Sequence, residues 1–413
     1  MILKPLVAST LVLGSLTLLG TAAGALPTPP GETEERSSTP LRGLVRTVDV
    51  ELEGGSVVIR QGSKPAVDVV TRTSGTAEPE VRVVHEDGVL EVKAECDYPL
   101  QGPIVVVNGY NACDIDLVIT VSSGAVDTTV DAQGDVSVTG LRGRHDLRSG
   151  TGDLTVVGTS GTHRLATSSG RLTTRDVSAD TVALTTSTGD VVVDRATATR
   201  SFGARTSSGD VRAAGVRAAS LSIVTSTGDV ALTGSSVVGS SVFDTSSGAV
   251  SVTDVRAGAL DVRTSTADIV LQRVVSARAL PVRTSSGRVT VTAVTAPALP
   301  VVTSTGDVTV RDGALRDTSV ETSSGDVSVR GAVLQRLRLT ASTGDLDVDL
   351  PVAPAELVGS TSSGNVIAVV PRGSYRLELS GDVVARDGVL ADDTAPRRIA
   401  LSSDTGDVSL RGR

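Results

Sequence analysis

Aromatic side chains are almost absent from this chain of 413 residues. Trp does not occur, and the complete set of aromatic residues is Phe202, Phe243, Tyr98, Tyr110 and Tyr375. A compact globule of this length normally fills a thick core with aromatic rings, whereas the narrow core of a solenoid is filled by Val, Leu, Ile and Ala. The scarcity of aromatics therefore favours a fold with a thin aliphatic core.

Basic clusters and catalytic clusters are also missing from the sequence. The net charge of -9 is modest, and no stretch resembles the basic stripe with which proteins bind nucleic acid. The three histidines, His85, His145 and His163, are scattered along the chain, and no nucleophile elbow is visible. We therefore expect no nucleic-acid partner, no cofactor, no metal and no catalytic residues.

A six-residue phrase recurs through most of the chain. It reads Thr-Ser-Ser-Gly-Asp-Val or Thr-Ser-Thr-Gly-Asp-Val, as at 206–211, 225–230, 303–308 and 322–327. Neighbouring copies lie 18 to 20 residues apart. A period in this range is typical of a solenoid, in which one repeat buries its apolar face only against its neighbours. The sequence predicts an all-β fold, a parallel β-solenoid (β-helix) with rungs of 19–20 residues.

Apolar residues alternate on both sides of the phrase. Counted from its glycine, they stand at minus seven and minus five, as Leu221 and Ile223 do, and at plus two and plus four, as Val230 and Leu232 do. A period of two predicts a half-buried strand on each side. Because the first strand puts odd offsets inward and the second puts even offsets inward, the chain must switch faces between them. We place the switch at Gly-Asp, since glycine tolerates the backbone angles of a bend.

This placement predicts a role for each residue of the phrase. The Thr at minus three and the Ser or Thr at minus one should face inward, and the Ser at minus two should face water. The Asp at plus one should be an exposed corner residue that hydrogen-bonds its own turn. The repeat-corner residues expected on this basis are Gly189, Asp190, Gly209, Asp210, Gly228, Asp229, Gly306, Asp307, Gly325, Asp326, Gly344 and Asp345.

Other interpretations of the same arrays compete with this one. The column of aspartates could bind calcium between rungs, but calcium needs six or more oxygens, and the glycine-paired nonapeptide of calcium-binding β-rolls is missing. Thr225, Thr264 and Thr303 would suit an ice-binding solenoid only if they formed an exposed flat row. They stand at an odd offset from the glycine, however, and we expect the odd offsets of this strand to face inward. A polysaccharide lyase or glycosidase built on a β-helix is the enzyme alternative, and it would need a pair of acids standing apart from the repeat.

The first 121 residues differ from the rest. Residues 1–25 resemble a secretory signal peptide, with an uncleaved membrane anchor as the competing interpretation, and the Pro/Glu/Ser-rich stretch 26–42 reads as a flexible linker. Residues 43–121 are rich in strand patterns without the phrase, and we expect them to cap the repeats of 122–413, which become irregular after about 370. In an exported chain, Cys96 and Cys113 should form a disulfide whose loop carries Tyr98 and Tyr110.

The succession of strand patterns from Cys113 to Val156 resembles a known family. Leu117 to Gly124, Gly134 to Val138 and Gly152 to Val156 are similar to the bacterial "putative adhesin" family of β-strand-repeat envelope proteins, a domain-of-unknown-function family similar in turn to autotransporter adhesin heads. The resemblance covers roughly Leu44 to Arg413. It implies a single-stranded, right-handed β-solenoid exported to the envelope, with no known catalytic residues.

Together these observations predict an exported, non-catalytic, adhesin-like protein of the cell envelope, periplasm or extracellular space. Its expected partners are envelope or surface proteins or glycans. A membrane partner follows only if the signal segment stays uncleaved. The ligand, the anchoring route and the oligomeric state are left open by the sequence.

Overall fold

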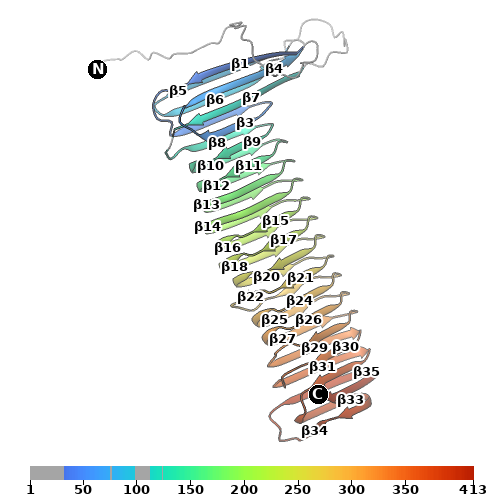
Figure 1. Ribbon diagram of the computed structural model, residues 1–413. Coiled ribbons are helices and arrows are strands. Elements are labelled where there is room, and N and C mark those ends of the chain that lie inside the picture. Colours follow the sequence, from blue (N-terminus) through green and yellow to red (C-terminus); the bar gives the residue numbers. More distant parts are fainter. Residues whose placement is uncertain (1–31, 75–76, 98–111, 123) are drawn as a thin grey trace, which may run out of the picture. The chain divides into compact units, whose positions relative to one another are not determined.

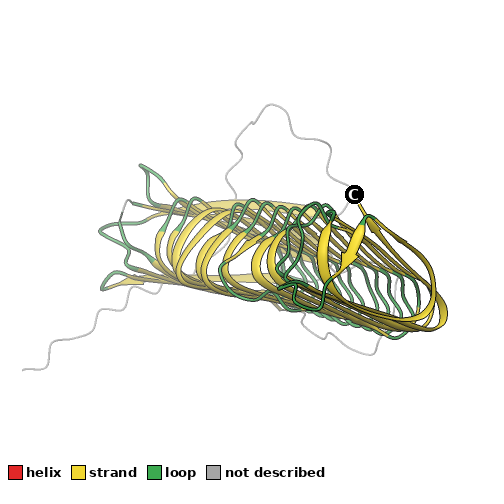
Figure 2. Cartoon of the chain, turned by 90° about the horizontal axis from the view of Figure 1, so that it is seen from below, coloured by secondary structure: helices red, strands yellow, loops and turns green. Residues whose placement is uncertain are grey.

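The structure, a computed structural model, describes residues 32–74, 77–97, 112–122 and 124–413. The predicted signal peptide 1–25, the start of the predicted linker, and Tyr98 and Tyr110 lie outside these residues. The described residues form strands and loops without a helix (Figure 2), so they contain no helix able to cross a membrane. The chain divides into two compact units, 1–189 and 190–413.

The first unit holds the strands labelled β1 to β13 in Figure 1. They are β1 (Glu32–Pro40), β2 (Thr47–Leu52), β3 (Val57–Gln61), β4 (Ala66–Ser74), β5 (Glu78–Glu86), β6 (Val89–Asp97), β7 (Ala112–Val121), β8 (Asp127–Ala132), β9 (Val136–Thr139), β10 (Arg142–Ser149), β11 (Leu154–Val157), β12 (Ser160–Thr167) and β13 (Leu172–Thr185).

The second unit holds β14 to β35. They are β14 (Val191–Arg205), β15 (Val211–Ala214), β16 (Arg217–Val224), β17 (Val230–Thr233), β18 (Ser236–Asp244), β19 (Val250–Thr253), β20 (Arg256–Arg263), β21 (Ile269–Gln272), β22 (Val275–Ser276), β23 (Val282–Arg283), β24 (Val289–Thr292), β25 (Thr295–Val302), β26 (Val308–Arg311), β27 (Ala314–Thr322), β28 (Val327–Arg330), β29 (Arg336–Thr343), β30 (Leu346–Asp349), β31 (Glu356–Ser363), β32 (Val366–Val370), β33 (Gly373–Asp387), β34 (Val389–Ala391) and β35 (Arg398–Gly412).

The predicted parallel solenoid is confirmed. Each turn pairs in parallel with the next, as β15 does with β17 and β16 does with β18, and the solenoid has about 14 turns of ~19 residues. The aliphatic residues expected to face inward do so: Leu221, Ile223, Val230 and Leu232 are at most 2% exposed. The core is therefore the thin aliphatic layer that the scarcity of aromatics indicates.

The start of the first unit departs from simple stacking. The predicted linker is strand β1 over Glu32–Pro40, antiparallel to β4, and β4 is itself antiparallel to β7, as β5 is to β6. These antiparallel strands cover the parallel turn made by β6 and β7. The turn of β2 and β3 lies one step further in, between β6/β7 and β8/β9. The capping role expected for 43–121 thus involves antiparallel strands as well as early turns.

At the end of the second unit, as at the start of the first, the strands do not stack in the order of the chain. The final strand β35 pairs with β31 and β32 on one side and with β33 on the other, although β33 precedes it in the chain. The C-terminal strand is therefore held between two neighbours. This irregularity begins after β32, where the regular turns end.

Candidate functional site

In several turns the threonine at minus three ties the corner to the preceding turn, although the Thr322 hydroxyl makes no hydrogen bond in the described structure. In the second unit, the hydroxyl of Thr225 accepts a hydrogen bond from the Gly228 N–H (3.2 Å) and donates one to the Gly209 carbonyl (3.3 Å). Thr245 repeats the arrangement with the Gly248 N–H (3.1 Å) and the Gly228 carbonyl (3.4 Å). Both hydroxyls are thus buried with their hydrogen-bonding capacity used, which avoids the cost of an unpaired buried polar group.

The aspartate column forms a second ladder. The Asp229 carboxylate accepts a hydrogen bond from the backbone N–H of Ala249, the residue at the same position in the next turn, at 2.8 Å. All six predicted corner aspartates bond the next turn in this way at 2.7 to 3.1 Å: Asp190, Asp210, Asp229, Asp307, Asp326 and Asp345. Asn365 continues the ladder by accepting from the Asp407 N–H at 3.0 Å. The prediction that each aspartate bonds its own turn is therefore wrong; it joins two turns.

The corner glycines are required by packing between turns. A Cβ on Gly228 would lie far inside van der Waals contact of the Gly209 carbonyl oxygen, and Gly306 and Gly325 are crowded in the same way by the preceding corner. In the first unit, Gly189 is crowded by Gly170. A positive φ is found only at Gly344 (+144°) among the predicted corner glycines. The backbone-angle explanation is thus wrong for the others: the missing Cβ lets two corners approach closely.

Ala267 is a natural exception to this rule. It occupies a glycine position and is partly exposed, whereas Gly228 and Gly248 are buried. Thr264 still donates to the Gly248 carbonyl at 3.1 Å, but in the described structure Ala267 makes no hydrogen bond to the Thr264 hydroxyl. The alanine corner therefore keeps the hydroxyl bond to the preceding turn and lacks the N–H to hydroxyl bond within the corner.

The face switch lies two residues earlier than predicted. Thr225, Thr264 and Thr303 are buried (3%, 6% and 4% exposed), as expected, but the residues at minus one are exposed, Thr227 and Thr305 among them. The serine at minus two and its neighbour at minus one both point outward, so the bend lies between them and not at Gly-Asp. The minus-three threonines cannot form the exposed flat row that the ice-binding alternative requires.

A second corner was missed by the sequence analysis. Six residues after most corner positions, the backbone adopts a left-handed conformation, for example at Asp254 (φ 56°), Arg273 (52°), Ala293 (54°) and Asp312 (53°). Gly215, Gly234 and Gly331 occupy the same position in other turns. Glycine recurring at plus six was the available signal, since this conformation favours glycine over other residues. This second corner connects one strand of the turn to the strand that follows it.

The disulfide and the histidines belong to the first unit. Cys96 and Cys113 are bonded, with Cα atoms 6.2 Å apart, and join the end of β6 to the start of β7. His145 and His163, scattered in the sequence, occupy the same register position on β10 and β12, with ring centroids 5.0 Å apart. Both are fully buried. Among the described residues, no group of three or more His, Cys, Asp or Glu could hold a metal ion.

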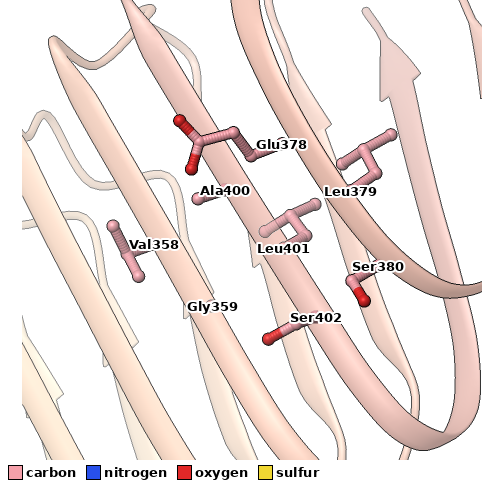
Figure 3. A pocket seen from close by; sticks show the side chains of 8 residues that line it. All are labelled: Val358, Gly359, Glu378, Leu379, Ser380, Ala400, Leu401 and Ser402. Carbon is pink, nitrogen blue, oxygen red and sulfur yellow. The ribbon is translucent and has the colours of Figure 1, made fainter.

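One open hollow lies on the second unit, beside the C-terminal strands. It measures about 300 Å³ and lies among β31, β33 and β35 (Figure 3). Its lining is mostly small or apolar, with Glu378 as its one acid. The Arg398 guanidinium pairs with this carboxylate at 2.6 Å and holds its pKa below the ordinary value. The hollow thus lacks the two converging acids that a glycosidase needs.

Comparison with known proteins places the chain in a family. A family model described as Toastrack DUF4097 matches residues 45–257 and 250–411. The chain belongs to the Toastrack DUF4097 family. The two matches mean that the Toastrack pattern occurs twice, and together they cover the regular turns of both units. The resemblance to a β-strand-repeat family of unknown function is confirmed.

The chain was also compared with curated proteins and with solved structures. No curated protein matches the chain. Among solved structures, a "putative cell adhesion protein" from Clostridium sporogenes ATCC 15579 aligns at 11% identity and a TM-score of 0.21, covering 56% of this chain and 100% of that one. A likeness this loose supports no conclusion about the function of this Toastrack protein.

Proposed function

We propose that this Toastrack protein is an exported, non-catalytic, adhesin-like module that uses a sheet face of its solenoid to contact envelope proteins or glycans. The observation that supports it is an uncharged outer face on four consecutive parallel strands of the second unit, β17, β19, β21 and β24. We call it the neutral face; its outward residues are Ala231, Thr233, Ser251, Thr253, Val270, Gln272, Thr290 and Thr292.

The neutral face presents uncharged side chains, mostly Ser and Thr, at a regular spacing. Ser251, Val270 and Thr290 lie opposite one another on adjacent strands, and the strands repeat every ~4.8 Å. Charged residues bound it, with Arg212 on β15 at one end and Arg311 on β26 at the other. Each hydroxyl contact would be weak, but an extended partner could engage several rungs at once, which raises the overall affinity without any single strong site.

The test is a pull-down of the full chain against envelope proteins, together with a glycan array. Thr290→Glu places a charge on the neutral face, and Ser222→Glu on the exposed outer side of β16 is the matched control. We expect Thr290→Glu to weaken capture and Ser222→Glu to leave it unchanged. Failure of the wild-type chain to enrich any partner, combined with hydrolysis or elimination on a polysaccharide panel, would replace this proposal with the enzyme alternative.

A further inference from the structure

A polar column interrupts the aliphatic core of the first unit. The register aligns Val48, Thr128, His145, His163 and Val182 on five adjacent strands. At the same offset in the second unit, most turns bury leucine, as at 221, 260 and 280, while Ser241 and Thr318 are small polar exceptions and Phe202 is an aromatic one. The two imidazoles, which are the titratable side chains of this column, thus occupy positions where most other turns bury an aliphatic side chain.

Each imidazole has one nitrogen bonded and one buried without a partner. The Thr128 hydroxyl lies 2.7 Å from His145 Nδ1, and the Thr159 hydroxyl lies 2.6 Å from His163 Nε2. His145 Nε2 and His163 Nδ1 are buried and make no hydrogen bond in the described structure. A neutral imidazole tolerates this environment, whereas an imidazolium would place a charge and an unsatisfied donor in an apolar layer.

The surroundings offer little compensation for a positive charge: backbone groups at Leu141 and Thr162 favour the charged forms of His145 and His163, but burial disfavours these forms more strongly. On β8, Asp127 attracts a charge on His145, but its carboxylate already accepts a hydrogen bond from the Arg144 N–H at 2.7 Å. On the other side, His145 and His163 face each other, and β13 brings Val182 against His163. The remaining charged residues of β10 and β12 point to the outer side by strand alternation: Arg142, Arg144, Asp146, Arg148 and Arg164.

We propose that the stacked pair His145–His163 is an acid-sensitive device that opens the turns of β8 to β12 when protons enter the core. Burial lowers the pKa of each histidine from 6.5 to about 4. An unfolded segment would bind protons near pH 6.5, so it holds more protons than the folded one between these values. The stabilisation is therefore complete above pH 6.5 and is lost as the pH falls towards 4.

The protein contains its own control. All three histidines lie in the first unit, and the second unit carries the same corner aspartates without any histidine. Acid effects on carboxylates should therefore appear in both units, whereas the histidine effect should be confined to the first. Proton linkage gives the expected size: between pH 6 and 4.5, the opening equilibrium should increase about ten-fold per pH unit for each histidine exposed.

The experiment is hydrogen exchange of the full chain, corrected for intrinsic rates, with peptides from 126–167 compared with peptides from the second unit. The logarithm of the opening constant for 126–167 should change with pH with a slope of about -2. His145→Leu combined with Thr128→Val should reduce the slope to about -1, as should His163→Leu with Thr159→Val. All four substitutions together should abolish it, and His85→Gln should change nothing.

Two results would overturn the proposal. One is a wild-type slope for 126–167 equal to that of the second unit. The other comes from titrating the histidine C2 protons of the wild-type chain by NMR, a measurement that does not depend on the variants folding. Midpoints for His145 and His163 near 6.5, in place of about 4, would mean that burial does not exclude the proton.

Discussion

The substitution Gly228→Ala tests the contact on which the stacking of the corners depends. The added Cβ would collide with the carbonyl of Gly209, far closer than the ~3.5 Å of ordinary carbon contacts. Because the obstacle is backbone, the corner itself has to move. Ala267, which occupies a glycine position, is partly exposed and makes no N–H to hydroxyl bond in the described structure. An unsatisfied buried N–H costs about 1–3 kcal/mol and overpacking a further ~1–3 kcal/mol.

Against these losses stands the reduced flexibility of the unfolded chain, which favours alanine by about 0.4–1 kcal/mol. We expect Gly228→Ala to destabilise the turns on either side by about 2–4 kcal/mol. The matched reverse change is Ala267→Gly. It allows the N–H of residue 267 to bond the Thr264 hydroxyl, but it makes the unfolded chain more flexible. The two effects oppose each other, so the stability should change by less than ~1 kcal/mol.

Native-state hydrogen exchange is the suitable assay, because the stability of a solenoid is local to each turn and a single melting temperature would not resolve it. Peptides spanning 206–250 and 248–290 report the two sites. If Gly228→Ala leaves the opening free energy of 206–250 within 0.5 kcal/mol of wild type, the close approach of the corners is not what selects glycine, and the packing explanation fails.

Three further substitutions test other parts of the structure by the same exchange measurement. Asp229→Ala should destabilise its turn by about 0.5–1.5 kcal/mol by leaving the N–H of the next turn without its acceptor, whereas Asp229→Asn should have little effect because the amide oxygen can accept; equal effects would refute the ladder. Thr245→Val should cost about 2–3 kcal/mol and Thr245→Ser much less, because only serine keeps both hydrogen bonds; a well-tolerated valine would contradict this role. Replacing Cys96 and Cys113 by serine should destabilise the first unit by about 3 kcal/mol and leave the second unchanged, since a closed loop of this size restricts the unfolded chain; a loss of protection in both units would be inconsistent with a local crosslink.

The inward and outward pattern of the strands was predictable because it depends on local alternation. The burial of Leu221, Ile223, Val230 and Leu232 follows from a period of two repeated in register. The corner was less predictable, because alternation stops at a bend. The sequence requires one change of face between minus three and plus two, but it does not say at which bond. The structure places it between minus two and minus one, which turns Thr227 outward.

The partners of the corner residues were also beyond sequence reasoning. An aspartate after a glycine suggests a bond within its own turn, since that is the nearest backbone. In the stacked solenoid, the next turn lies only ~4.8 Å away, and its N–H at the same position becomes the available donor. Likewise, His145 and His163 are 18 positions apart in sequence, and only the register of β10 with β12 brings their rings together.

The sequence alone determined that the chain forms stacked turns of 19–20 residues with a thin aliphatic core, because a repeated pattern of apolar residues fixes which face each strand buries. The tertiary structure decided which atoms meet between turns: the glycine packed on the preceding carbonyl, the aspartate bonded to the following turn, and the final strand inserted beside its predecessor. These contacts join residues about one full turn or more apart, and their existence depends on the register of stacking, which no single repeat contains.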